Sequence, residues 1–151
     1  MKYSPRQLIG LLRTPLGRQQ IVAGLRHRAW PAYAAAARLH RARLPATTRL
    51  TAVVGTYGKT TTSRAVRAAL GLDPAAHVSA NCWDHVARRV LAVRAHDRHA
   101  VIEVGIAAPG QMALYANVVR PDVVVVTSIG SEHRRALGTL ERTRDEKAHM
   151  V

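Results

Sequence analysis

The chain has 151 residues, 48% of them hydrophobic, which suits about one domain with a substantial core. Its single cysteine, Cys82, excludes an internal disulfide and any zinc site built from several cysteines. No apolar run approaches the ~18–20 residues that span a bilayer, and we expect no secretory signal because the start of the chain lacks a clean apolar segment with a cleavage site.

Charge is distributed unevenly along the chain. Residues 1–72 contain 13 Lys and Arg and no Asp or Glu, whereas residues 73–151 contain 10 basic and 9 acidic residues. Leucine spacing and an alanine run predict helix in the first 48 residues, and Pro15 and Pro31 are expected to divide it into pieces. We therefore predict a basic helical N-terminal arm, residues 1–48, in front of a domain formed by residues 49–151.

From residue 49 onward, predicted strands alternate with predicted helices. The strands are short Val-, Ile- and Leu-rich runs at 50–54, 100–104 and 123–127, with a further extended piece around Val78. The helices are expected at 59–70, 83–95, 109–119 and 139–150, the third beginning at Pro109. This alternation predicts an α/β fold, a parallel sheet with helices on both faces, and the glycine-rich motif described next makes it one of the P-loop type. Ligands of such sheets bind beyond the carboxyl ends of the strands.

The first motif lies between a predicted strand and a predicted helix. Its glycines let successive backbone N–H groups point at a phosphate, and the helix N-terminus favours negative charge. A lysine there would contact the β- and γ-phosphates of ATP, and the next hydroxyl would coordinate Mg²⁺. The competing interpretation is an ordinary turn that contains Gly-Lys-Thr by chance. The motif consists of Gly55, Thr56, Tyr57, Gly58, Lys59, Thr60 and Thr61.

Two further strand ends carry candidate metal ligands. Glu103 ends a buried strand, where a carboxylate is costly unless it is paired or bound to a metal, and its oxygens suit Mg²⁺. His133 follows the 123–127 strand by a short loop, although a lone histidine is more often structural. Composition alone makes Lys147 only a solvated lysine on the last helix.

Together, residues 49–151 resemble the central ATPase domain of the Mur ligase family, with a pattern closest to its D-alanyl-D-alanine-adding branch, MurF. The family's loop is Gly-Thr-x-Gly-Lys-Thr/Ser-Thr, so two residues between the glycines are normal there. Residues 102–105 with Pro109-Gly110 resemble the branch's Glu-Met-Gly…Pro-Gly segment. Residues 121–133 resemble Pro-Asp…Thr-Asn-Ile-Gly-x-x-His, and residues 137–139 its Phe-Gly-Ser. Tyr57, Ser128 and Glu132 depart from the family's usual residues.

The resemblance implies a function and assigns roles. Lys59 and the loop amides would bind ATP phosphates, and Thr60, Glu103 and His133 would be Mg²⁺ ligands. Lys147 falls where the branch has a carbamylated lysine that helps to place a second Mg²⁺, and Asn81 falls near the acceptor substrate. A carboxylate would attack the γ-phosphate of ATP to give an acyl phosphate, which an amine would then attack, as in the synthesis of cell-wall peptides.

The resemblance also leaves alternatives open. The family has further domains, so we expect a fragment, a split-gene product that needs a partner chain, or a decayed paralogue, located in the cytoplasm. Polyglutamate, cyanophycin and folate-type ligases use the same core. A non-catalytic nucleotide-binding protein could instead dock through residues 1–48 on an anionic membrane, with Leu and Trp side chains facing the lipid, or on nucleic acid. Of these two surfaces, we expect the membrane rather than nucleic acid.

Overall fold

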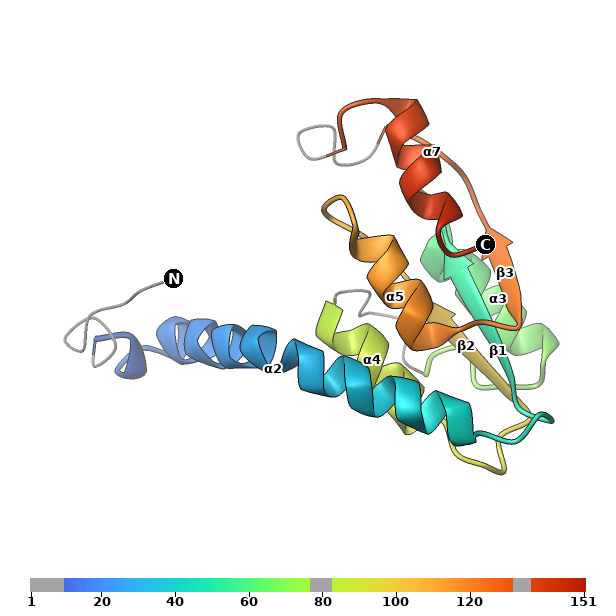
Figure 1. The fold of residues 1–151 in the computed structure, drawn as a ribbon, viewed down its shortest axis with the longest axis horizontal. Helices are drawn as coiled ribbons and strands as arrows, with labels where there is room; N and C mark the ends of the chain where they lie inside the picture. The colour runs from blue at the N-terminus through green and yellow to red at the C-terminus, as the bar shows by residue number, and fades with distance from the viewer. Residues whose placement is uncertain (1–9, 77–82, 132–136) are drawn as a thin grey trace.

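A computed structural model describes residues 10–76, 83–131 and 137–151 of the chain (Figure 1). The predicted extended piece around Val78 and the candidate residues Asn81 and His133 lie outside the described residues. Three parallel strands form one sheet in the order β2-β1-β3. Their bounds are Arg49–Val54 for β1, His99–Glu103 for β2 and Val123–Val126 for β3.

β1 is the central strand, since a strand pairs with each of its edges, and it is buried from its second residue onward. Ala52 of β1 lies opposite Ile102 of β2 and Val124 of β3. The mostly apolar sequence of the strand is that of a central parallel strand with both faces covered. The parallel sheet predicted from the alternating pattern is confirmed.

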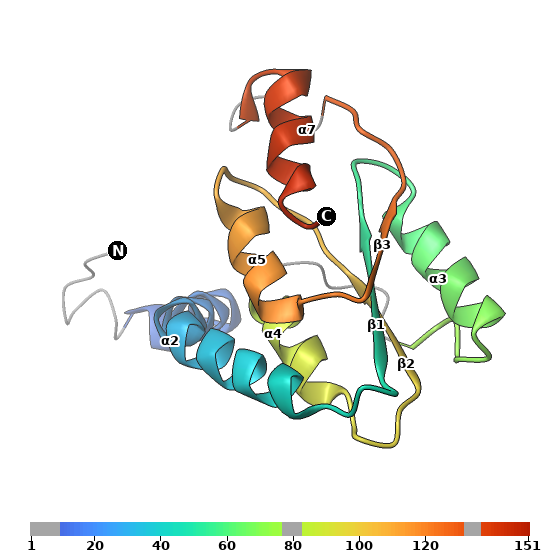
Figure 2. The same ribbon diagram turned by 45° about the vertical axis from the view of Figure 1, so that its right-hand side comes forward.

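Helices cover both faces of this sheet, as Figure 2 shows. α3, Lys59–Ala69, packs on β1 and β2 from one side, and α4, Trp83–Ala92, contacts β2 and α5, Gln111–Val119, on the other. α7, Leu140–Ala148, contacts α5 beside the carboxyl end of the sheet. The core contains no Phe and consists mainly of Val, Leu, Ile and Ala, with Met112, Tyr115 and Met150 filling the larger spaces.

Most of the basic N-terminal segment forms one long helix, α2, Pro15–Arg43. The predicted break at Pro15 is confirmed, because a turn at residues 13–14 separates the helical residues 10–12 from α2, whereas the predicted break at Pro31 is wrong. Pro15 occupies the first turn, where its missing N–H costs nothing, and Thr14 caps the helix by accepting the Gly17 N–H at 3.0 Å. The helix continues through Pro31 because packing supports it on both sides of the proline, through Trp30 and Tyr33.

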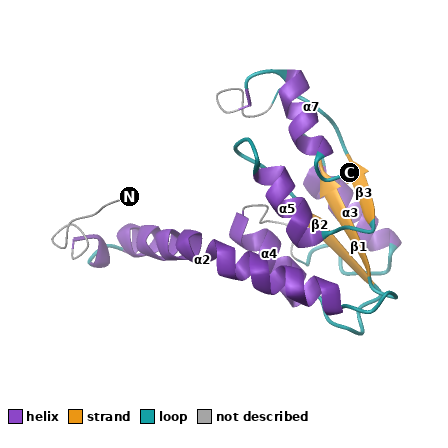
Figure 3. Ribbon diagram, viewed as in Figure 1, coloured by secondary structure: helices purple, strands orange, loops and turns teal. Residues whose placement is uncertain are grey.

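α2 has two halves with different surroundings (Figure 3). Its second half lies across α4 and α5, where Ala37 is fully buried, while its first half extends away from the rest of the molecule. Trp30 stacks edge-to-face on Tyr115 with ring centroids 5.8 Å apart, so this Trp packs within the protein rather than facing lipid. None of the helices in the described ranges is both long and apolar enough to cross a membrane.

Several predicted helix ends shift by a few residues. α5 begins at Gln111 after Gly110, which adopts a left-handed conformation with φ 79°, so Pro109 precedes the helix instead of opening it. α4 ends at Ala92 rather than residue 95, since Asp97 accepts the Arg94 N–H at 2.7 Å and closes a turn there. These shifts leave the strand ends that position the candidate site unchanged.

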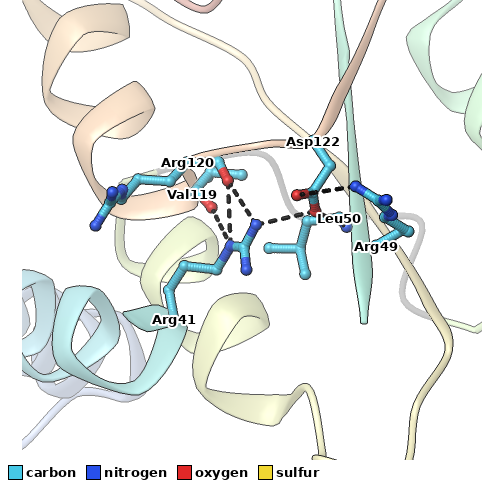
Figure 4. A network of polar contacts seen from close by, with 6 residues as sticks. All are labelled: Arg41, Arg49, Leu50, Val119, Arg120 and Asp122. Atoms are coloured by element: carbon cyan, nitrogen blue, oxygen red, sulfur yellow. Dashed lines mark hydrogen bonds and ion pairs between the residues drawn. The ribbon is translucent and has the colours of Figure 1, made fainter. Parts of the chain in front are cut away.

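Arg41, near the end of α2, fastens this helix to the amino end of the sheet (Figure 4). Its guanidinium donates to the carbonyls of Val119 and Arg120 at the C-terminus of α5, at 2.9 to 3.2 Å, and to Asp122 at 2.9 Å. The same Asp122 oxygen accepts the Leu50 N–H at 2.7 Å. One carboxylate therefore joins α2 to the beginning of β1, and the guanidinium stabilises carbonyls that α5 leaves unpaired.

Candidate functional site

The glycine-rich loop lies where β1 ends and α3 begins, at the carboxyl edge of the sheet. Gly55 has φ 145° and Gly58 has φ 78°, both in the region that side chains other than glycine avoid. Gly58 is the N-cap residue of α3 and has no side chain to cap the helix, so Lys59 and the residues after it form the helix N-terminus. The predicted strand–loop–helix arrangement is therefore present, with free backbone donors expected in the first turn of α3.

Two lysines converge on this loop. Lys59 is only 8% exposed, and its ammonium donates to the carbonyls of Gly55 at 3.0 Å and Thr56 at 2.7 Å. Lys147, only 3% exposed, donates to the same Gly55 carbonyl from α7. Gly55 and Lys147 are 92 positions apart in sequence, so the packing of α7 over the sheet edge creates this arrangement. Two buried ammonium groups therefore lie at one carbonyl of the loop.

A pair of oxygen-bearing side chains lies in the same region. The Thr60 hydroxyl, in the first turn of α3, donates to Glu103 at 2.9 Å, and Glu103 ends β2. Pairing of β1 with β2 puts Glu103 opposite Val53, two residues before the loop. Hydroxyl and carboxylate oxygens are the donors that Mg²⁺ prefers, so this pair fits the hard cation that the sequence predicts.

Three of the four predicted metal ligands, Thr60, Glu103 and Lys147, lie within the described ranges. Within them, no three His, Cys, Asp or Glu side chains gather as ligands. His133 and Asn81 lie outside those ranges, so their predicted roles stay predictions. Of the other loop residues, Thr61 is exposed on α3 and Tyr57 is 65% exposed beside the loop.

Sequence reasoning missed the contribution of Thr127 and Ser128. The Thr127 hydroxyl donates to the Tyr57 carbonyl at 2.6 Å, and the Ser128 hydroxyl accepts the Tyr57 N–H at 2.9 Å. The sequence placed both residues at a strand end on this edge of the sheet, but it assigned no role to their hydroxyls. Two hydroxyl residues at the carboxyl end of the strongest predicted strand were the available signal, because that strand end adjoins the loop.

Comparisons with known proteins agree with this arrangement. The sequence model of the Mur ligase middle domain matches residues 53–151. A UDP-N-acetylmuramoyl-tripeptide–D-alanyl-D-alanine ligase of Bacillus subtilis is 34% identical over 107 residues, covering 69% of this chain and 23% of that protein. A ligase of the same name from Borreliella burgdorferi is 26% identical over 106 residues, covering 66% of this chain and 22% of that protein.

A solved structure supports the fold. The crystal structure of MurF from Acinetobacter baumannii superposes with a TM-score of 0.72 at 23% identity, covering 80% of this chain and 27% of that one. The chain thus spans less than a quarter of the length of the two curated relatives. Because the middle-domain model covers most of the chain, the protein belongs to the Mur ligase family.

Proposed function

We propose that this chain supplies the ATP-binding portion of an ATP-dependent ligase that joins a carboxylate to an amine. The observation that carries the proposal is the convergence of the buried Lys59 and Lys147 on the carbonyl of Gly55. Family membership and the names of the two relatives support a ligase that acts on peptidoglycan precursors. Such a ligase would work in the cytoplasm, where ATP is available.

The phosphate-binding part would follow from the loop itself. N–H groups in the first turn of α3 and the helix dipole favour an anion at the loop. Lys59 would exchange its contacts with loop carbonyls for contacts with the β- and γ-phosphates, which compensate its charge better. Neutralising the phosphates in this way lowers the barrier to nucleophilic attack on the γ-phosphorus.

Thr60 and Glu103 would hold Mg²⁺, with His133 as a further ligand. When bound, this ion would supply positive charge to the phosphoryl oxygens. Lys147 in its carbamylated form would help to place a second ion. Carbamylation replaces the ammonium by an N–H that carries a carboxylate, so Lys147 would keep one donor for the Gly55 carbonyl and gain oxygens for the ion.

The proposed reaction has two steps. A substrate carboxylate attacks the γ-phosphorus of ATP, and ADP leaves to give an acyl phosphate. An amine then attacks the acyl carbon, an amide bond forms, and inorganic phosphate leaves as the amine loses a proton. Activation is needed because a free carboxylate is a poor electrophile. By analogy with the relatives' names, the carboxylate would belong to a UDP-N-acetylmuramoyl-tripeptide and the amine to D-alanyl-D-alanine, with Asn81 near the acceptor.

Nucleotide titration tests the binding proposal. We expect wild type to bind ATP more tightly with Mg²⁺ than without it, and Lys59→Met to weaken binding by about 10- to 100-fold, the loss of one or two charge-assisted hydrogen bonds. Arg64→Met is the matched control, because it also removes one positive charge from α3 but its side chain is exposed. Equal affinity of Lys59→Met and wild type would contradict the proposal.

Isotope transfer tests the reaction type. UDP-N-acetylmuramoyl-tripeptide labelled with ¹⁸O in its acceptor carboxylate would be incubated with the chain, Mg·ATP and D-alanyl-D-alanine. An acyl phosphate route moves one ¹⁸O into inorganic phosphate, detected by mass spectrometry. ATP binding without phosphate release under these conditions would favour a non-catalytic nucleotide-binding protein.

A second candidate function rests on the projecting half of α2. Leu16 and Leu25 are 66% and 59% exposed there, and the region contains basic residues without acidic ones. These features suit docking on an anionic membrane, where basic side chains meet lipid headgroups. Salt-sensitive cosedimentation with phosphatidylglycerol vesicles but not phosphatidylcholine vesicles, lost in Arg13→Ser/Arg18→Ser, would support it.

A further inference from the structure

The segment of residues 127–130, here termed the clamp segment, contacts the glycine-rich loop, residues 55–61, through both its backbone and its side chains. Backbone groups of the segment contact Thr56: the Ser128 carbonyl accepts the Thr56 N–H at 2.8 Å, and the Gly130 N–H donates to the Thr56 hydroxyl at 2.9 Å. Side-chain contacts involve Tyr57, whose carbonyl accepts from Thr127 at 2.6 Å and from Ser128 at 3.2 Å. The Tyr57 N–H donates to the Ser128 hydroxyl at 2.9 Å.

These contacts have an electrostatic consequence for an anion. A carbonyl oxygen carries partial negative charge, so a carbonyl that turned toward a phosphate would repel it. Each of the first three loop carbonyls is held by a donor: Gly55 by Lys59 and Lys147, Thr56 by Lys59, and Tyr57 by the clamp hydroxyls. Lys59 would leave its carbonyls to contact phosphate, whereas the clamp hydroxyls would remain.

The Thr127 hydroxyl is also seated against Gly55. A Cβ atom built on Gly55 would lie 2.0 Å from this hydroxyl oxygen and 3.0 Å from the Ser128 backbone nitrogen. The clamp segment therefore fixes the loop at its first glycine and again at Tyr57. All three Tyr57 contacts are at the surface, so little of the core depends on them.

We propose that Thr127 and Ser128 are positioning residues for nucleotide binding, which hold both peptide groups of Tyr57 and keep its carbonyl away from the phosphates, so that the N–H groups after Tyr57 face them. The proposal rests on the proposed function, since it requires the loop to bind phosphate. Preorganised dipoles of this kind favour an anion because no reorientation is needed when it arrives.

Titration of Mg·ATP into hydroxyl variants tests the proposal. We expect Thr127→Val and Ser128→Ala to weaken binding about three- to tenfold each, the contribution of a typical hydrogen bond. The conservative variants Thr127→Ser and Ser128→Thr keep the hydroxyl and should bind within about twofold of wild type. Normal binding by these conservative variants would show that the hydroxyl positions the loop and that packing of the rest of the side chain does not.

Matched controls remove hydroxyls elsewhere. Thr48→Val and Ser63→Ala delete buried hydroxyls that make no hydrogen bond in the described structure, and they should leave Mg·ATP affinity unchanged. The melting temperature of each variant reports whether it has lost stability as well.

The outcomes are distinguishable. If wild type and Lys59→Met both fail to bind Mg·ATP, the proposed function fails and the positioning role fails with it. If wild type binds, Lys59→Met does not, and Thr127→Val and Ser128→Ala bind as wild type does, only the positioning role is refuted. Affinity that falls in proportion to melting temperature, without rescue by Thr127→Ser, also refutes it.

Discussion

Replacing Arg41 by methionine should destabilise the protein more than the same change at Arg49, although both guanidinium groups contact Asp122. Arg41 lies 2.9 Å from the carboxylate with a side chain 14% exposed, whereas Arg49 lies 3.8 Å away and is 62% exposed. Arg41 also donates to the Val119 and Arg120 carbonyls, and Arg49 has no such contact in the described structure. Each variant removes one positive charge from a chain of net charge +14, so general charge repulsion changes equally.

The magnitude follows from burial. Breaking a fully buried ion pair costs about 3–5 kcal/mol, and exposed pairs contribute about 0–1 kcal/mol. Asp122 is 23% exposed, so the Arg41 pair lies nearer the buried limit, and we expect Arg41→Met to lose about 2–3 kcal/mol of unfolding free energy. Arg49→Met should lose less than about 0.5 kcal/mol.

Urea denaturation followed by circular dichroism measures both values. For a chain of this size, the Arg41→Met loss corresponds to a melting temperature lower by about 5–10 °C. A double-mutant cycle with Asp122→Asn, which keeps an acceptor for the Leu50 N–H, isolates the direct pair. Equal losses for the two arginine variants would show that Arg41 does not fasten α2 to the sheet.

Three other predictions concern single side chains. Gly55→Ala should abolish nucleotide binding and lower stability, because its Cβ would lie 2.0 Å from the Thr127 hydroxyl. A Cβ on Gly58 meets no atom within 4 Å, so Gly58→Ala should lose only about 1–2 kcal/mol of unfolding free energy, the cost of a left-handed backbone. Thermal melts and nucleotide titration measure both variants. Thr48→Val should be neutral or stabilising in urea melts, since its buried hydroxyl makes no hydrogen bond in the described structure. Thr139→Ala should raise the pKa of Glu141, which backbone and Thr139 hydrogen bonds hold below its ordinary value. An NMR titration measures that pKa. Because it is depressed in the folded protein, ionised Glu141 stabilises the fold above the ordinary pKa of glutamate, and this stabilisation is lost as pH falls through the folded value.

Local sequence signals were sufficient to predict the sheet and the loop. Apolar runs without charge identify β1 and β3, and glycine spacing between a strand and a helix identifies residues 55–61. The contact of Thr60 with Glu103 also follows from the sequence, because parallel strands bring their carboxyl ends to one edge.

Contacts between distant segments could not be predicted from local patterns. Lys147 meets Gly55 only because α7 packs over the sheet edge, and only the family resemblance singled it out. Pro31 was expected to break a helix, yet its effect depends on packing of α2 against α4 and α5, which composition does not reveal. Thr127 and Ser128 became visible when the structure placed them beside Tyr57.

The central claim is that residues 55–61 hold the phosphates of ATP beside a metal bound by Thr60 and Glu103. A crystal structure with Mg²⁺ and a non-hydrolysable ATP analogue tests it directly. We predict the β- and γ-phosphates at the N-terminus of α3 in contact with Lys59, and the ion bound by Thr60 and Glu103. Phosphates bound elsewhere, such as at the basic edge near Arg41 and Arg49, or an ion without either ligand, would contradict the account.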